Sequence, residues 1–142
     1  MSSELTVRPY RPDDESAVIG LWQRCGLTRP QNNPKLDIER KMKVQPELFL
    51  IGLLGGTIIA SVMGGYEGHR GWINYLGVDP RFQRKGFGRQ MMEIIQAKLN
   101  LSGCPKINLQ VREDNLEAIE FYNAIGYLRD PVVSMGKRLI KD

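Results

Sequence analysis

Apolar and polar residues follow strand-like or helical spacing along most of the chain. Alternation predicts a first strand over residues 5–10, and the polar run 12–14 is typical of the start of a helix. Four apolar residues at helical spacing extend that helix to about residue 24. A segment rich in glycine, proline and asparagine predicts a loop over residues 26–33, and residues 36–42 predict a short second helix.

The middle of the chain has a strong hairpin signal. Two apolar runs, residues 48–54 and 57–63, flank the pair Gly55-Gly56. Because glycine readily adopts the positive φ that two-residue turns require, this pattern predicts two antiparallel strands joined by a tight turn. A further strand is predicted over residues 72–78, ending before an Asp-Pro pair.

The second half alternates between helical and strand patterns. It predicts a helix over residues 87–101, a strand over 106–112, a helix over 115–124 and a final strand over 132–139 that Gly136 interrupts. The predicted order is β-α-α-β-β-β-α-β-α-β. This order indicates an α/β (α+β) fold with an antiparallel front half and a βαβ back half, in a single domain over residues 1–142.

Composition narrows the function classes. The 142 residues are 42% hydrophobic, enough for one core, and no apolar run is long enough to span a membrane. With no signal-peptide pattern, we expect a cytoplasmic protein. Cys25 and Cys104 lack a metal-ligand spacing and His69 is the single histidine, so we expect reduced structural thiols and no metal. The net charge of +4 suits an anionic partner such as a phosphorylated cofactor, and no nucleic-acid-binding motif appears.

The sharpest chemical feature is a basic, glycine-containing segment between a predicted strand and a predicted helix. Gly86 and Gly88 would let a ligand approach the backbone, and Arg84, Lys85 and Arg89 add positive charge. Unpaired N–H groups and the helix dipole favour an anion at such a helix start. The segment matches neither the dinucleotide fingerprint nor a Walker A loop. Alternatively, the glycines only allow tight packing and the basic side chains are merely solvated.

Two motifs in this order resemble the GNAT superfamily of acetyltransferases, whose members bind acetyl-CoA. The first is Gln83-x-x-Gly86-x-Gly88 after the strand that ends near Val78. The second is Asn115-x-x-Ala118-x-x-Phe121-Tyr122-x-x-x-Gly126-Tyr127. The resemblance covers essentially the whole chain and is greatest to small bacterial members related to the ribosomal-protein N-terminal acetyltransferases. It implies a mixed sheet of about seven strands with about four helices, and a splayed gap between strands 4 and 5.

The resemblance also implies roles for particular residues. Backbone groups of Leu76 and Val78 would pair with the pantetheine arm, and N–H groups of residues 84–89 would bind the pyrophosphate. The Asn115 side chain would contact pantetheine, and Tyr122 would protonate the departing thiolate. The implied cofactor-binding set is Leu76, Gly77, Val78, Gln83, Arg84, Lys85, Gly86, Phe87, Gly88, Arg89, Asn115 and Tyr122. Without the resemblance, Phe121-Tyr122 would be interpreted as packing the helix against the sheet.

The catalytic base is where the sequence departs from the related branch. That branch has a glutamate where this chain has Gln110, and an amide cannot accept the proton. Glu67 is the tentative base, His69 lies close to it in the same connection, and Glu113 and Asp114 fall in a turn. The acceptor amine stays open among a protein N-terminus, a lysine and a small molecule. The alternative functions are a catalytically silent CoA-binding module and a basic nucleic-acid-binding protein. The resemblance also allows a homodimer.

Overall fold

The computed structural model describes residues 4–142, and the chain divides after Leu109 into two compact units. The first unit contains a five-stranded sheet with the strand order β1-β2-β3-β4-β5. Its strands are β1 (Thr6–Pro9), β2 (Phe49–Leu54), β3 (Thr57–Tyr66), β4 (Gly71–Val78) and β5 (Ile107–Leu109). Its α-helices are α1 (Glu15–Arg24), α2 (Pro34–Lys41) and α3 (Phe87–Leu101), and short 3-10 turns lie at Pro12–Asp14, Pro46–Leu48 and Pro80–Phe82. The second unit, residues 110–142, contains α4 (Leu116–Ala124).

The sheet joins an antiparallel meander to one parallel strand. Strands β1 to β4 pair antiparallel with their neighbours, and β5 pairs parallel with β4 after the crossover through α3. The hairpin turn between β2 and β3 has φ values of 57° at Gly55 and 83° at Gly56. Both values are positive, as a two-residue hairpin turn of this kind requires, so the predicted hairpin is confirmed.

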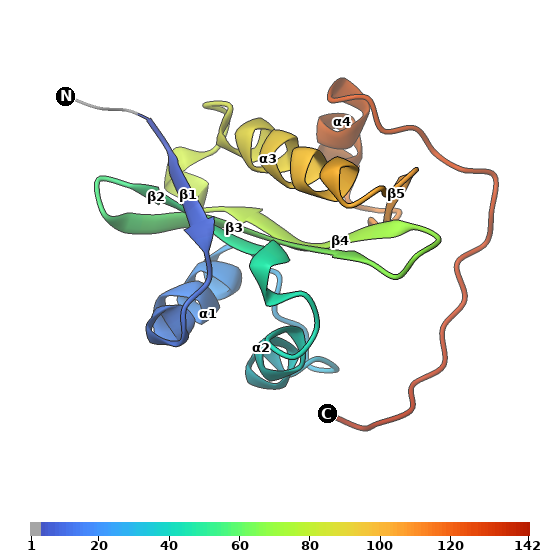
Figure 1. Ribbon diagram of the computed structural model, residues 1–142, viewed down its shortest axis with the longest axis horizontal. Coiled ribbons are helices and arrows are strands. Elements are labelled where there is room, and N and C mark those ends of the chain that lie inside the picture. Colours follow the sequence, from blue (N-terminus) through green and yellow to red (C-terminus); the bar gives the residue numbers. More distant parts are fainter. Residues whose placement is uncertain (1–3) are drawn as a thin grey trace. The chain divides into compact units, whose positions relative to one another are not determined.

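Helices cover both faces of the sheet in the first unit. Helices α1 and α2 lie on one face and α3 lies on the other (Figure 1). The core on the α1 and α2 face consists of Tyr10, Val18, Leu21, Trp22, Ile38, Phe49, Ile51 and Met63. On the other face α3 buries Met91, Met92, Ile95 and Leu99. These residues recur at helical spacing, which is why the sequence pattern located α3 accurately.

The α/β fold class and mixed sheet are confirmed, although the described residues form five strands rather than about seven. The predicted helix over residues 87–101 forms with the same bounds. The strand predicted over residues 106–112 is shorter and contains Ile107–Leu109 alone. Strand β4 pairs with β5 only over Gly71–Ile73 and then continues to Val78. Within residues 4–109 the two strands therefore lose their ladder where the splayed gap was expected.

The prediction of a final strand over residues 132–139 is wrong. No residue from 128 to 142 is helical or extended in a strand, and Val133 and Met135 are 85% and 90% exposed. The apolar pattern identified residues that suit a strand, but a strand also needs a partner for its backbone hydrogen bonds. Within residues 110–142 the one regular element is the helix α4, and a helix has no row of free backbone groups with which a strand could pair.

Close contact between β3 and α3 yields a stability prediction. A Cβ on Gly64 would lie 2.7 Å from Cγ1 of the fully buried Ile95, whereas one on the adjacent Gly65 would lie 3.5 Å from its nearest neighbour, Oε1 of Gln45. We expect Gly64→Ala to lower the free energy of unfolding by about 1–3 kcal/mol through overpacking. The matched variant Gly65→Ala should change it by less than about 0.5 kcal/mol. Urea denaturation of both variants measures the difference, and equal effects would contradict the packing described for α3.

Candidate functional site

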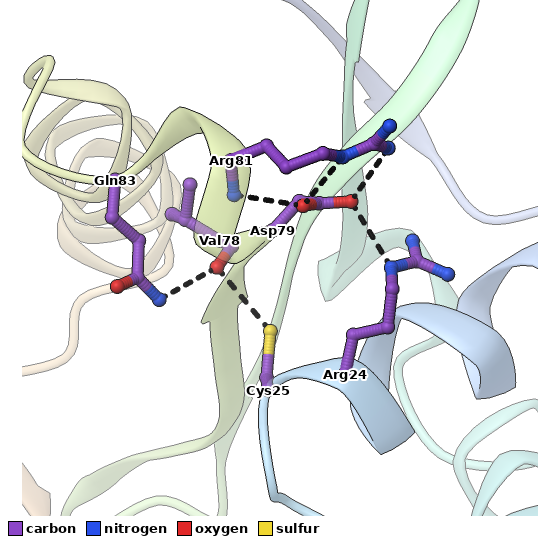
Figure 2. Close-up of polar contacts among 6 residues, drawn as sticks. All are labelled: Arg24, Cys25, Val78, Asp79, Arg81 and Gln83. Atoms are coloured by element: carbon purple, nitrogen blue, oxygen red, sulfur yellow. Dashed lines mark hydrogen bonds and ion pairs between the residues drawn. The ribbon is translucent and has the colours of Figure 1, made fainter.

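The segment from the end of β4 to the start of α3 is organised around Asp79. This residue follows β4 directly and is 1% exposed. Its carboxylate accepts hydrogen bonds from the backbone N–H of Arg81 at 3.0 Å and from the Arg81 guanidinium at 3.1 and 3.2 Å. Arg24, at the end of α1, donates from Nε at 3.1 Å (Figure 2). Two separate parts of the unit, the end of α1 and the turn after β4, therefore converge on one buried charge.

Pairing with arginine controls the protonation of Asp79. Hydrogen bonds from Arg81 are the largest influence and hold the pKa of Asp79 at about 2, against the opposing effect of burial. The backbone N–H of Asp79 also donates to the Ile59 carbonyl at 2.8 Å, which ties the junction to β3. Asp79 is thus ionised and immobilised at neutral pH, and it sets the direction in which the chain leaves the sheet.

The last residue of β4 is engaged from both sides. The Val78 carbonyl accepts from Nε2 of Gln83 at 3.0 Å and from the Cys25 thiol at 3.3 Å (Figure 2). Both lone pairs of this oxygen are used, so a ligand amide that pairs there must displace a donor. Gln83 is exposed and can turn to water. Burial raises the pKa of the Cys25 thiol to about 11, which makes it an unreactive thiol, as expected for a structural cysteine.

The loop ahead of α3 exposes the start of the helix. Gly86 is the N-cap of α3 with φ 86°, and no side chain caps it. Residues 83–86 are exposed, whereas Phe87 is 6% exposed and anchors the first turn in the core. The N–H groups of a first helical turn have no acceptor within the helix, and the helix dipole favours an anion in front of them. A helix start of this geometry is chemically suited to an anion.

Basic side chains surround this helix start. Arg84 adopts a left-handed φ of 62°, which turns the chain sharply just before Gly86. Arg84, Lys85 and Arg89 are all exposed. Lys85 and Arg81 both approach the Phe82 ring, with their charged groups 5.8 and 5.6 Å from the ring centroid. The predicted residues 76–78 and 83–89 are thus brought together in one unit at the β4–α3 junction.

Glu67, the tentative base, has a structural task in the β3–β4 turn. Its carboxylate accepts from the backbone N–H of His69 at 2.6 Å and also from that of Arg70. These two hydrogen bonds, first that from Arg70, lower the pKa of Glu67. A carboxylate stabilised in its charged form is a weaker proton acceptor. The role of Glu67 as base stays a prediction, and the two backbone hydrogen bonds that its carboxylate accepts oppose that role.

The remaining predicted residues lie in the second unit. Asn115 is the N-cap of α4, where its side-chain oxygen accepts from the Ala118 N–H at 3.2 Å. Tyr122 makes edge contacts with the rings of Phe121 and Tyr127, at centroid distances of 5.1 and 5.8 Å. Burial, with a smaller contribution from Tyr127, raises the pKa of Tyr122 to about 12. The Gln110 amide donates to the Ser134 hydroxyl.

Sequence reasoning missed two polar clusters of the first unit. One is the pairing of Asp79 with Arg24, which are 55 positions apart, and the other links Tyr75 to Asp37, which are 38 positions apart. The Asp-Pro pair after a strand was a signal for the first cluster, because aspartate often caps a turn there. Across residues 4–142, the structure contains no group of three or more potential metal-ligating side chains. No helix in the same part of the chain is long and apolar enough to cross a bilayer.

The chain is similar in sequence and in fold to known acetyltransferases. Residues 10–127 match the family model described as "Acetyltransferase (GNAT) family". An acetyltransferase of Pectobacterium atrosepticum is 48% identical over 138 residues, covering 97% of this chain and 98% of the relative. The ribosomal-protein alanine N-acetyltransferase of Escherichia coli superposes with a TM-score of 0.73 at 23% identity, covering 87% of this chain and 77% of that protein.

A third comparison includes a bound cofactor analogue. The aminoglycoside N-acetyltransferase AAC(6')-Iy, solved in complex with the bisubstrate analogue CoA-S-monomethyl-acetylneamine, superposes with a TM-score of 0.78. It covers 96% of this chain and 99% of that protein at 17% identity, so it demonstrates the shared fold. The resemblance inferred from the two motifs is confirmed at the level of the family.

The buried Asp79 leads to a prediction about acid stability. An aspartate titrates at about 3.9 in the unfolded chain and this one at about 2 in the fold, so its charge stabilises the fold above pH 4 by about 2.5 kcal/mol. That contribution is lost as the pH falls from about 4 through 2. Asp79→Asn should therefore lower the free energy of unfolding by about 2.5 kcal/mol at pH 7, with a gap to wild type that narrows below pH 4.

Urea denaturation at pH 7, 4 and 2.5 measures this gap. Asp13→Asn is the control, since Asp13 is exposed, and it should shift stability by less than about 0.5 kcal/mol. A gap for Asp79→Asn that stays constant down to pH 2.5 would show that its charge is not the stabilising feature.

Proposed function

Because this chain belongs to the GNAT acetyltransferase family, we propose that it transfers the acetyl group of acetyl-CoA to a primary amine by direct attack in a ternary complex. As an acyltransferase it needs a cofactor site, an amine acceptor and a route for two protons. In this proposal residues 1–142 act as one acetyltransferase domain in the cytoplasm. The acceptor is a protein N-terminus, a lysine or a small-molecule amine.

The observation that carries the proposal is the uncapped start of α3 beside β4. Gly86 leaves the first-turn N–H groups open to a ligand, and three exposed basic side chains, from Arg84, Lys85 and Arg89, lie around it. In the proposal these N–H groups bind the pyrophosphate of acetyl-CoA. The pantetheine arm then runs along the backbone of Leu76 and Val78, displacing the Gln83 side chain from the Val78 carbonyl.

The chemistry requires a neutral amine and a proton for the leaving thiolate. A lysine with a pKa of about 10.4 is neutral at pH 7 in roughly one molecule in 2,500, and an α-amine at about 7.8 in roughly one in seven. Because position 110 is a glutamine and not a glutamate, an acceptor whose amine has a low pKa is favoured. We propose Tyr122 as the general acid, whereas the Glu67 carboxylate that the sequence suggests as base already accepts two backbone hydrogen bonds.

A catalytically silent CoA-binding module is the second candidate. Gln110 occupies the base position, and its amide is engaged with Ser134. Incubation with labelled acetyl-CoA and a panel of amines, read by mass spectrometry, separates the two candidates. Acetylated product supports the enzyme, and cofactor binding without any acetylated product supports the silent module.

A charge placed at Gly86 tests the cofactor site. Gly86 and Gly103 have φ values of 86° and 88°, and an added Cβ would meet nothing within 4 Å at either position. Gly86→Glu and Gly103→Glu therefore carry the same backbone strain at opposite ends of α3. We expect Gly86→Glu to weaken CoA binding at least about 100-fold by placing a carboxylate against phosphate, while Gly103→Glu binds as wild type does.

Isothermal titration calorimetry with CoA measures both variants. If Gly86→Glu binds CoA normally, the pyrophosphate does not bind at the start of α3. If both variants lose CoA affinity equally, strain in α3 and not the added charge is the cause.

Removal of the Tyr122 hydroxyl tests the acid. With the pKa of Tyr122 at about 12 and that of a free thiol at about 8.5, proton transfer to the thiolate is uphill by about 3–4 pKa units. The hydroxyl therefore acts at the low end of general-acid effects, and Tyr122→Phe should reduce kcat about 10- to 100-fold with the Kd for CoA unchanged. Steady-state release of free thiol measures kcat. Tyr127→Phe is the matched control, and an unchanged kcat for Tyr122→Phe would exclude the role.

A further inference from the structure

Strand β4 contains a bulge that alters which side chains share a face. Ser61 is paired with Gly77 and Met63 with Asn74, so Tyr75 and Leu76 together lie opposite the single residue Val62. Tyr75 has a φ of 52°, a left-handed conformation that a bulky residue rarely adopts. Strained backbone of this kind persists where the surrounding structure imposes it, and it is concentrated at functional sites.

The bulge places Tyr75 on the α1 and α2 face of the sheet. Met63, paired with Asn74, belongs to the core on that face, so in a regular strand the next residue would point to the α3 face. Instead the Tyr75 ring stacks on Trp22 of α1, with centroids 3.9 Å apart and an interplanar angle of 16°. Asn74 and Tyr75 therefore face the same side, opposite α3.

A hydrogen-bond network holds this conformation. The Trp22 indole N–H donates to the Ser61 hydroxyl at 2.8 Å, and that hydroxyl donates to the Tyr75 carbonyl at 2.8 Å. The Tyr75 hydroxyl donates to Oδ2 of Asp37, on α2, at 2.5 Å. Charge-assisted O–H to carboxylate hydrogen bonds of this length are the strong ones. Both ends of Tyr75 are thus fixed by residues from other elements.

This pair lies where the proposed reaction needs a proton acceptor. Tyr75 directly precedes Leu76, whose backbone is the proposed contact of the pantetheine arm, and it lies beyond Ile73, where the β4–β5 ladder ends. Tyr75 and Asp37 are both partly exposed, and the side chain of Asp37 is 28% exposed to solvent. Water can therefore reach the carboxylate, and in the proposal the amine approaches the phenol from the partly exposed side of Tyr75.

We propose that Tyr75 is the catalytic proton acceptor of the transfer and that Asp37 is its positioning partner. The inference rests on the proposed acetyl transfer. The nitrogen lone pair forms the new N–C bond, and the C–S bond breaks with its electrons on sulfur. The proton of the attacking nitrogen passes to Oη of Tyr75 as the phenol proton passes to Oδ2 of Asp37. Asp37 returns that proton to water, and the thiolate is protonated by the general acid.

The other candidates are less suited to this step. The Gln110 amide has no basic site, and the Glu67 carboxylate already accepts from two backbone N–H groups that favour its charged form. The Asp37 carboxylate also has a cationic neighbour, Arg40 at 3.6 Å, but it differs from Glu67 in accepting the Tyr75 phenol, so a proton can move along that hydrogen bond. Tyr75 and Asp37 together can therefore act as the base in place of the glutamate that Gln110 replaces.

Conservative variants of the pair test the inference. Tyr75→Phe keeps the ring that stacks on Trp22 and removes the hydroxyl, and we expect kcat to fall about 100-fold. Asp37→Asn should reduce kcat by a similar factor, and Asp37→Glu should restore it to within about tenfold of wild type. The KM for acetyl-CoA should stay within about twofold in each variant. The assay uses the amine that wild type acetylates fastest in the panel, with free thiol and labelled product as readouts.

The matched control is Tyr10→Phe, which removes a hydroxyl from a buried tyrosine stacked on Phe49 in the same core. It should leave kcat within about twofold of wild type. A fully active Tyr75→Phe, an equal loss in Tyr10→Phe, or a loss confined to Glu67→Gln would overturn the inference. Failure of the proposed function would differ from these outcomes, because wild type itself would then bind no acetyl-CoA or acetylate no amine.

Discussion

A buried carboxylate at the end of β4 is the interaction on which the proposed cofactor site depends. A buried charge is tolerated only when it is paired and fully hydrogen-bonded, so Asp79 requires the donors that Arg81 and Arg24 supply. Meeting that requirement brings the end of α1 against the strand and turns the chain through Pro80–Phe82. The path to Gly86, and hence the position of the α3 start beside Val78, follows from this pairing.

Strand β4 contributes to both of the proposed sites. Its end offers backbone groups and leads into the uncapped start of α3, whereas its middle presents Tyr75 toward α1 and α2. A regular strand could not do both, since alternate side chains would send Tyr75 to the α3 face. The bulge opposite Val62 resolves this conflict, and the Ser61 hydroxyl stabilises it through the Tyr75 carbonyl.

The two proposed tasks also differ in how they depend on sequence. The anion site at α3 uses main-chain N–H groups, so its main sequence requirement is a glycine that can adopt φ 86° and leave room in front of the helix. Proton transfer uses side chains from separate elements, such as Tyr75 on β4 and Asp37 on α2. In the proposal, such a pair takes over the task of the glutamate that Gln110 replaces, without any change in the segment before α3.

Local patterns in the sequence determined the helix over residues 87–101, the Gly55-Gly56 hairpin and the glycine-containing segment before α3, because each depends on residues close together in the chain. The family resemblance depended on the same local motifs. Tertiary structure alone decided which distant side chains meet, as at Asp79 with Arg24 and at Tyr75 with Asp37. It also decided that residues 132–139 form no strand, because strand formation depends on a partner for backbone hydrogen bonds and an apolar pattern does not specify one.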